Sequence, residues 1–404
     1  MQTKLSNNRV VLDIDLFAGA GGLAIGLRRA GFTPIDVYEI DKTACMTLTR
    51  NSGSGLSTLV GNVHEQDVRQ TDWITLKPSV RLLAAGAPCQ PFSLSGNHGA
   101  HADHRNMLPE VVRAARELRP QAILMENVQG LLRTEFRPYF EYILRAVELP
   151  SLRQRKNETW EQHDKRLRQE QCHARYVPDY LVSWRLLEAA DFGVPQMRKR
   201  VFIVATRCDL PVFRFPSPTH SEAELRLALA TAQYWEERNL KPPKGWKKQS
   251  PQASPRDPAR IRPLPWRTVR DAIRCLPEPA RSEEGSEMNH WVIPGARSYP
   301  GHIGSNLDWP SKTIKAGVHG VPGGENTIIG DNGRIRYYTL REAARLQTFP
   351  DEHYFEGSRL RVTKQLGNAV PCTLATAVSL PLMAVLAHIK IGELWVESSE
   401  RAVH

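Results

Sequence analysis

The sequence has 404 residues, with 54 Lys or Arg against 43 Asp or Glu, and a formal net charge of +11 at neutral pH. The length suffices for a catalytic core and a second lobe, and the positive charge fits a polyanionic partner such as nucleic acid. No basic segment followed by an apolar core lies near Met1, which excludes a typical secretory signal. We expect a cytoplasmic protein. The first motif begins at Asp15, so we expect no N-terminal regulatory domain.

Cysteine spacing and one apolar stretch exclude further classes of protein. No CxxC pair occurs, which predicts free thiols in a reducing compartment and no zinc site. The six cysteines are Cys45, Cys89, Cys172, Cys208, Cys275 and Cys372. Residues 369–389 are long and apolar enough to resemble a membrane span, but they contain Pro371 and Pro381. We expect a packed C-terminal helix there.

The N-terminal half alternates between strand and helix patterns. Residues 10–41 predict a strand ending at glycines, an amphipathic helix and a second strand. Residues 80–128 predict a strand running into a cysteine loop, then a helix and another strand. This alternation predicts an α/β fold with a doubly wound sheet, in which ligands bind beyond the carboxyl ends of the strands.

The later sequence interrupts this core and then completes it. Residues 151–175 mix both charge signs densely, which favours a solvated helical insertion in a catalytic domain spanning 1–207. From Cys208 the chain is rich in Pro, Gly and basic residues, which predicts a smaller second domain over 208–335. Core-like patterns return over 336–390, before a tail at 391–404.

A glycine loop follows the first predicted strand, in "DLFAGAGGLAIGL" from Asp15 to Leu27. Glu39 ends the next predicted strand about 20 residues beyond Gly19, where a carboxylate can accept from ribose hydroxyls. The spacing of Gly19, Gly21 and Ala24 also matches a loose form of the glycine pattern found in dinucleotide-binding loops. The loop alone therefore leaves open a nicotinamide or flavin enzyme, or a simple tight turn.

A lone cysteine stands in "GAPCQPFSLSG", residues 86–96. Pro88 and Pro91 restrict the backbone around Cys89 and present its thiol on a loop. Glu126, in "MENV", ends the next strand, so a thiol and a carboxyl should reach one cleft. The alternatives are a small buried hydrophobic cysteine and a solvated turn acid.

Two further motifs carry polar residues. Gln196, Arg198 and Arg200 alternate in "GVPQMRKR", so they point the same way if the segment is extended. An exposed strand face is the alternative. The "KQLGNAVP" motif at 364–371 contains a Gly-Asn turn that could be an ordinary loop.

Taken together and in this order, FAGAGG, PCQPFS, ENV, QMRKR and QLGNAVP resemble the motifs of the cytosine carbon-5 DNA methyltransferase family. The resemblance spans Asp15 to Pro371. It implies the Rossmann-like fold of S-adenosylmethionine-dependent methyltransferases with an inserted target recognition domain, S-adenosyl-L-methionine as cofactor, and no metal. It also implies double-stranded DNA as substrate, a monomer, and either the modification half of a bacterial restriction system with a cognate endonuclease or a standalone equivalent.

The resemblance implies a role for each matching residue. Cys89 would add to carbon 6 of a flipped cytosine, Glu126 would act at ring nitrogen 3, and Arg200 would contact the ring carbonyl. Arg198 would order the cysteine loop or support its thiolate. The implied cofactor residues are Phe17, Ala18, Gly19, Gly21, Gly22, Leu23, Glu39, Ile40, Asp67, Val68, Pro88, Leu108, Asn368, Ala369 and Val370. The implied DNA contacts are Gln90, Ser93, Ser95, Gln196 and Thr313.

Within these roles, Phe17 would stack near the adenine, Glu39 would bind the ribose, and Asp67 would sit beneath the adenine amino group. Ser95 would help to fill the space that the flipped base leaves, and Thr313 would lie near the target phosphate.

Two other functions stay open. A tRNA cytosine methyltransferase of the same fold is disfavoured by the long basic insertion, and a catalytically silent DNA-binding relative is disfavoured by the intact Cys89, Glu126 and glycines. An amino-methyltransferase is disfavoured because no DPPY-like tetrapeptide occurs.

Overall fold

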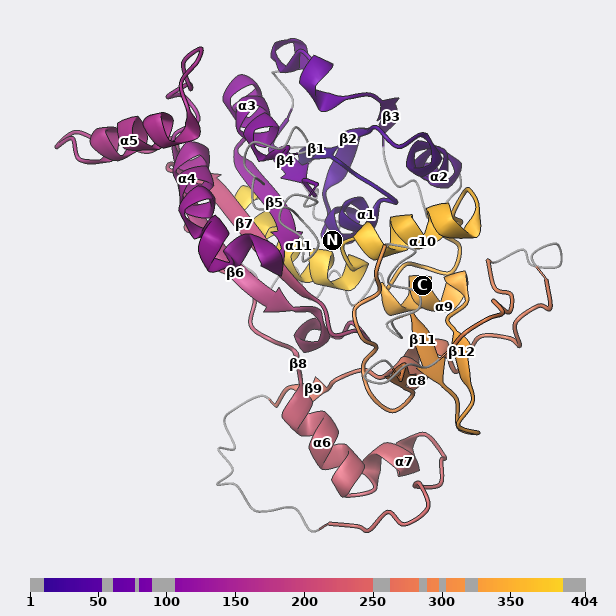
Figure 1. The fold of residues 1–404 in the computed structure, drawn as a ribbon. Coiled ribbons are helices and arrows are strands. Elements are labelled where there is room, and N and C mark those ends of the chain that lie inside the picture. The colour runs from indigo at the N-terminus through magenta and orange to yellow at the C-terminus, as the bar shows by residue number, and fades with distance from the viewer. Residues whose placement is uncertain are drawn as a thin grey trace, which may run out of the picture.

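The computed structural model describes residues 11–52, 61–76, 80–88, 106–249, 262–282, 289–297, 303–316 and 326–387. Its centre is a seven-stranded sheet in the order β3-β2-β1-β4-β5-β7-β6 (Figure 1). The strands are β1 Leu12–Leu16, β2 Thr33–Glu39, β3 Asn62–Glu65, β4 Leu82–Ala85, β5 Ala122–Val128, β6 Tyr180–Glu188 and β7 Lys199–Arg207. The predicted alternation of strands and helices is confirmed.

One strand runs against the rest of the sheet. β7 is antiparallel to both β5 and β6, whereas β1 to β5 pair in parallel. The sequence pattern did not indicate this reversal, because an apolar strand reads the same in either direction. The antiparallel register sets Arg200 opposite Val128, at the end of β5.

Helices cover both faces of the sheet, as a strand apolar on both sides requires. On one face, Leu83 and Ile123 pack with α3 and α4, and on the other, Leu82 and Leu124 pack with α1 and α11. The helices flanking the sheet are α1 Gly22–Arg29, α2 Lys42–Ser52, α3 Leu108–Leu118, α4 Arg137–Glu148, α5 Trp160–Gln171, α10 Arg359–Asn368 and α11 Cys372–Ala387.

The apolar C-terminal stretch packs inside the protein. Arg359–Ala387 is long and apolar enough to cross a membrane, but 83% of its most apolar window is buried. Its α11 half lies along α1, and a Cβ added at Gly26 would stand 2.3 Å from the Cβ of Ala375. The predicted packed helix is confirmed, and Gly26 permits the close approach.

The charged insertion is a helix with one buried face. Thr159 and Gln162 form a capping box at the start of α5. His163 lies 3.1 Å from the Tyr142 hydroxyl, and Asp164 pairs with Arg145 at 2.6 Å. The insertion is therefore helical as expected, but it is anchored to α4 by these buried polar contacts.

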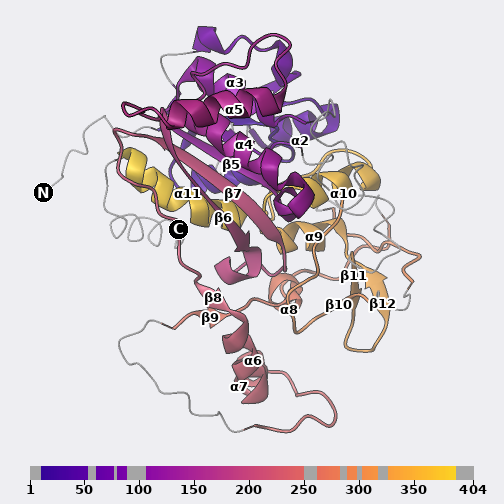
Figure 2. The same ribbon diagram turned by 60° about the vertical axis from the view of Figure 1, so that its left-hand side comes forward.

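Residues 208–335 contain small elements beside the main sheet (Figure 2). They are β8 His220–Ser221, α6 Glu222–Ala230, α7 Gln233–Glu237, β9 Leu264–Pro265, α8 Val269–Ile273, β10 Ser305–Asn306, β11 Thr327–Ile329 and the first residue of β12 Ile335–Tyr337. α9 Leu340–Leu346 follows them.

These elements divide between two hydrophobic clusters. α6, α7 and Trp266 pack with one another. Residues of α8 and β11 instead share a cluster with Ala18 and Ile25 of the glycine-loop region, and with Leu366 of α10. Part of the region is thus continuous with the core that carries the N-terminal glycines.

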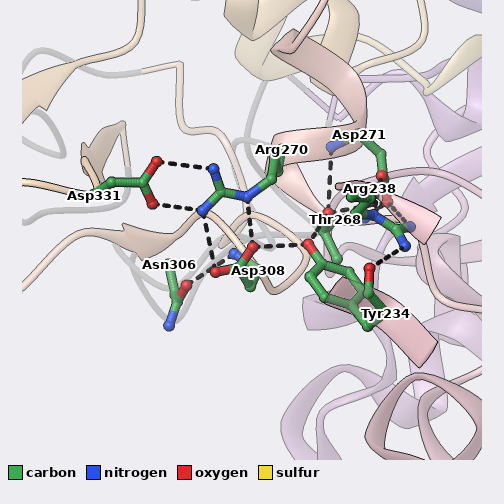
Figure 3. Close-up of polar contacts among 8 residues, drawn as sticks. All are labelled: Tyr234, Arg238, Thr268, Arg270, Asp271, Asn306, Asp308 and Asp331. Atoms are coloured by element: carbon green, nitrogen blue, oxygen red, sulfur yellow. Dashed lines mark hydrogen bonds and ion pairs between the residues drawn. The ribbon is translucent and has the colours of Figure 1, made fainter. Parts of the chain in front are cut away.

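An ion-pair network joins α7, α8, the 306–309 turn and the β11–β12 turn (Figure 3). Arg270 contacts both Asp308 and Asp331 at 2.6 Å, and the Tyr234 hydroxyl donates to Asp308 at 2.8 Å. Arg238 pairs with Asp271 at 2.8 Å. Because Arg270 and Asp308 are largely buried, the network orders four segments that lack long secondary structure.

Two buried acids lie on one face of β1. Asp13 and Asp15 are fully buried, and neither carboxyl has a hydrogen-bond partner among the described residues. Desolvation raises the pKa of Asp13 to about 8, and the pKa of Asp15 well above its usual value. We therefore expect both to be protonated in the folded protein at neutral pH.

Asp13→Asn should weaken the pH dependence of stability. The folded state keeps a proton that the unfolded chain releases above about pH 4, so the free energy of unfolding falls between about pH 4 and pH 8. The variant should lose this change of the unfolding free energy with pH, which is at most about 1.4 kcal/mol per pH unit. Urea titrations at several pH values measure the unfolding free energy. The exposed Asp72→Asn serves as control and should keep the parental slope. An unchanged slope in Asp13→Asn would contradict the assignment.

Candidate functional site

The glycine loop joins the end of β1 to the start of α1. Its backbone adopts positive φ at Phe17, Gly19 and Gly21, with values of 59°, 56° and 87°. The Ala18 N–H donates to the Tyr38 carbonyl at 3.2 Å, which attaches the loop to the end of β2. A Cβ added at Gly19 would meet nothing within 4 Å, so this loop has an open side.

Glu39 holds the glycine loop in place from the end of β2. One carboxylate oxygen accepts from the Gly19 N–H at 2.8 Å, and the other accepts from the N–H groups of Ile40 and Asp41 at 2.9 and 2.8 Å. The side chain predicted to bind a ribose thus also shapes the loop. The neighbouring Ile40 is 65% exposed, which leaves an apolar surface beside the carboxylate.

Asp67 lies just beyond β3 and caps the 3-10 helix Val68–Gln70. Its carboxylate accepts from the Arg69 N–H at 3.0 Å and pairs with the Arg69 guanidinium. This bond lowers the pKa of Asp67. Val68 is buried, and its carbonyl accepts from Arg113 of α3 at 2.7 Å. Asp67 is therefore ionised and fixed near the edge of the sheet.

The predicted residues of the C-terminal motif lie against the glycine loop. A Cβ at Gly22 would stand 2.2 Å from the Val370 carbonyl oxygen, so α1 begins directly against the start of α11. Asn368 is exposed, while Ala369, Val370 and Leu23 are buried. Two motifs about 350 residues apart by sequence number thus meet.

Pro88 and Leu108 differ in exposure. Pro88 is partly buried at the end of the strand segment, whereas Leu108 is fully buried in the core beneath α3. Leu108 contributes to packing, and its side chain has no exposed surface that could contact a ligand in this structure.

The predicted carboxyl Glu126 is paired. Glu126 in β5 and Arg200 in β7 form an ion pair with Oε1 and Nε 2.8 Å apart, and both side chains are nearly buried. Burial raises the pKa of Glu126, while the nearby Arg200 and Arg198 oppose the rise. The site therefore places a carboxyl with a raised pKa beside a permanent positive charge.

The start of the cysteine loop is attached to the same strand. The Asn127 amide donates to the Ala87 carbonyl at 3.3 Å, which ties the end of β5 to the residues just before Cys89. Cys89, Gln90, Ser93 and Ser95 lie outside the described residues.

Gln196 is not available to DNA in this structure, which corrects the expected contact. The side chain is fully buried. Its carbonyl accepts from the Ile314 N–H at 3.0 Å, and its amide donates to Leu346 and Gln347 at 3.2 Å. A side chain with no exposed surface and satisfied polar groups positions the backbone instead.

Arg198 is also buried and bonds main-chain carbonyls. Its guanidinium donates to Ile314 at 3.0 Å, Gly367 at 2.6 Å and Ala369 at 3.0 Å. The alternative of an exposed arginine face is therefore wrong for Arg198. These bonds join the segment 312–316 to the turn at 366–369.

Thr313 lies at the same junction. Its hydroxyl donates to the Met197 carbonyl at 2.7 Å, so its oxygen lone pairs remain for other partners. Sequence reasoning missed Gln347, which is fully buried and donates to the Leu366 carbonyl at 2.6 Å. Bonds to main-chain carbonyls leave no pattern in the acceptor's side chain, so no sequence signal could reveal them.

The arrangement suits S-adenosylmethionine. An open glycine turn, backbone N–H groups, a strand-end carboxylate and the exposed Ile40 combine polar and apolar contacts at one edge of the sheet.

Comparison with known proteins assigns the chain to a family. The family model described as C-5 cytosine-specific DNA methylase matches residues 11–149 and 154–382. Type II methyltransferase M.Eco47II of Escherichia coli is 33% identical over 394 residues, which cover 96% of this chain and 82% of the relative. Type II methyltransferase M.NgoMIV of Neisseria gonorrhoeae is 30% identical, with 92% and 97% covered.

A solved structure supports the fold. A DNMT2 mutant from Spodoptera frugiperda superposes with a TM-score of 0.55 at 16% identity, over 93% of this chain and 99% of that one. The mixed sheet with antiparallel β7 is typical of S-adenosylmethionine-dependent methyltransferases, so the predicted fold class is confirmed. The chain belongs to the C-5 cytosine-specific DNA methylase family and is a DNA (cytosine-5-)-methyltransferase that uses S-adenosylmethionine.

Proposed function

We propose that this enzyme is the modification methyltransferase of a type II restriction-modification system and acts on a flipped cytosine through a covalent Cys89 adduct. The observation that carries the proposal is the Glu126–Arg200 ion pair, whose strand is tied by Asn127 to the residues just before Cys89. The type II names of two relatives that match most of the chain support the restriction-modification context.

The chemistry requires three roles. The Cys89 thiolate forms a bond to carbon 6, and negative charge develops on the ring. Glu126, whose pKa burial raises, shares its proton with ring nitrogen 3, and Arg200 stabilises the ring carbonyl. S-adenosylmethionine supplies the methyl group to carbon 5 and leaves as S-adenosylhomocysteine. A proton then leaves carbon 5, and breakage of the carbon 6–sulfur bond releases 5-methylcytosine and the Cys89 thiolate.

We assign the cofactor to the loop between β1 and α1. Glu39 accepts from the ribose through lone pairs that its three backbone bonds leave, Phe17 and Ile40 contact the adenine, and Asp67 receives the adenine amino group. Asn368 and its neighbours contact the methionine portion. The open side at Gly19 and the exposed Ile40 support this assignment.

Residues 208–335 form the proposed target recognition region, between a catalytic part at 1–207 and its return at 336–390. The Arg198 bonds to both Ile314 and Ala369 support a coupling between this region and the cofactor side. Ser95 fills the space that the flipped cytosine leaves in the duplex. The Thr313 hydroxyl oxygen accepts hydrogen bonds near the target phosphate. We further propose a monomer that acts on chromosomal DNA in the cytoplasm beside a cognate endonuclease.

Bisulfite sequencing of plasmid DNA from cells expressing the enzyme should show protected cytosines within one short sequence. Cys89→Ser should abolish the protection, because the hydroxyl is a much weaker nucleophile. Cys275→Ser, at an exposed cysteine, is the matched control and should retain it. Protection in the Cys89→Ser strain would refute the covalent role. Its absence in both strains would point to an RNA substrate or to a catalytically silent DNA-binding protein.

Glu126→Gln should lower kcat by roughly 10²–10⁴-fold, because the amide cannot transfer a proton. In the parent enzyme, single-turnover rates should fall as pH rises through the raised pKa of Glu126, since the protonated carboxyl is the active form. Methyl transfer to duplex DNA measures both effects. Glu135→Gln, at a partly exposed ion pair, should behave as the parent. Parental turnover in Glu126→Gln would remove the acid role.

Glu39→Ala should weaken S-adenosylmethionine binding by at least about tenfold, because it removes the ribose acceptor and the Gly19 contact. Isothermal titration calorimetry measures the dissociation constant. Glu65→Ala, at the exposed end of β3, should leave it unchanged. Equal affinities for Glu39→Ala and the parent would exclude the proposed contact.

A further inference from the structure

A groove of about 420 Å³ opens between the α6–α7 pair and the segment 303–312. This volume lies in the usual range of ligand sites, about 300–1,000 Å³. Its walls are mainly apolar and aromatic. They include Met197, Leu229, Trp235, Ile303, Trp309 and Lys312.

One wall carries a buried donor without an acceptor. Trp235 is 5% exposed, and its indole N–H has no hydrogen-bond partner among the described residues. Leaving such a group unpaired costs about 1–3 kcal/mol. The nitrogen has almost no accessible surface, so this N–H does not face the groove, and Trp235 contributes carbon atoms of its ring to the wall.

The polar groups that line the groove favour an acceptor-rich ligand. The side-chain oxygen of Asn306 accepts from the Asp308 backbone N–H at 2.8 Å, which leaves the two hydrogens of the side-chain amide as donors. Lys312 adds a positive charge on a partly exposed side chain. The one carboxylate in the lining, Asp308, is engaged by Arg270 and Tyr234 (Figure 3).

The groove adjoins the catalytic strand. The Met197 N–H donates to the Ser311 carbonyl at 2.8 Å, which joins the groove wall to the segment before Thr313. Met197 is followed by the buried Arg198, and Arg200 pairs with Glu126. A DNA strand engaged at Arg200 would therefore pass close to the groove.

We propose that this groove binds one unstacked nucleotide of the substrate DNA, distinct from the target cytosine. The base lies between the apolar walls and accepts from the Asn306 side-chain amide, and its phosphate pairs with Lys312. Every nucleobase offers a ring nitrogen or carbonyl as acceptor, and aromatic walls suit its flat faces. This inference rests on the proposed base-flipping function.

The test uses duplexes that carry the bisulfite-determined site with 2-aminopurine at the target position or, one at a time, at each flanking position. Fluorescence should rise on enzyme binding at the target and also at one flanking position. Trp235→Phe keeps a ring but reduces the aromatic wall of the groove. It should reduce the flanking signal by at least about half and raise KM for DNA roughly tenfold, with kcat within about twofold.

Lys312→Gln provides a second, partly exposed variant. It should raise KM for DNA. It should also reduce the slope of log affinity against log salt concentration by about 1, the contribution of one phosphate contact. Trp184→Phe on β6 and the exposed Lys241→Gln are the matched controls and should leave KM and the flanking signal unchanged.

The possible outcomes distinguish failure of the groove proposal from failure of the proposed base flipping. A signal at the target but at no flanking position overturns the groove proposal and leaves base flipping intact. No signal at either kind of position refutes base flipping itself. If Trp235→Phe does not fold, the test rests on Lys312→Gln, and an unchanged KM and salt slope in that variant overturn the proposal. A groove that binds a protein partner would also leave KM and the salt slope unchanged.

Discussion

The buried guanidinium of Arg198 is the interaction on which the site depends. It bonds three main-chain carbonyls, at Ile314, Gly367 and Ala369, from segments that are distant in sequence. A charge buried this deeply is tolerated because those carbonyl dipoles replace water. The same bonds set the distance between the segment around Ile314 and the turn beside the glycine loop, so a shift of either segment would move the other.

Side chains bonded to main chain recur throughout the site. Glu39 orders the glycine loop, Gln196 receives the Ile314 N–H, and Asn127 holds the residues before the cysteine loop. Together with the core that α8 and β11 share with the glycine-loop region, these bonds connect residues 208–335 mechanically to the glycine loop. Reacting groups that must meet within a fraction of an ångström require such support.

Much of the fold was predictable because it depends on local pattern. Apolar periodicity located the alternating strands and helices, and strand-end placement brought Glu39 and Glu126 to the expected edge. The role of Gln196 was not predictable. Its alternation with Arg198 and Arg200 correctly indicated an extended segment, but burial depends on what packs over that segment, and Ile314 and Leu346 arrive from more than 100 residues away.

The sequence alone determined the class of fold, the family and the identities of the chemical groups, because these follow from short motifs whose residue types are needed for the reaction. Only the tertiary structure decided the reversed direction of β7, the pairing of Glu126 with Arg200, the burial of Gln196 and the aromatic groove at Trp235. These properties arise where distant segments meet, and neither a residue's neighbours in the chain nor its own chemistry specifies which surface will cover it.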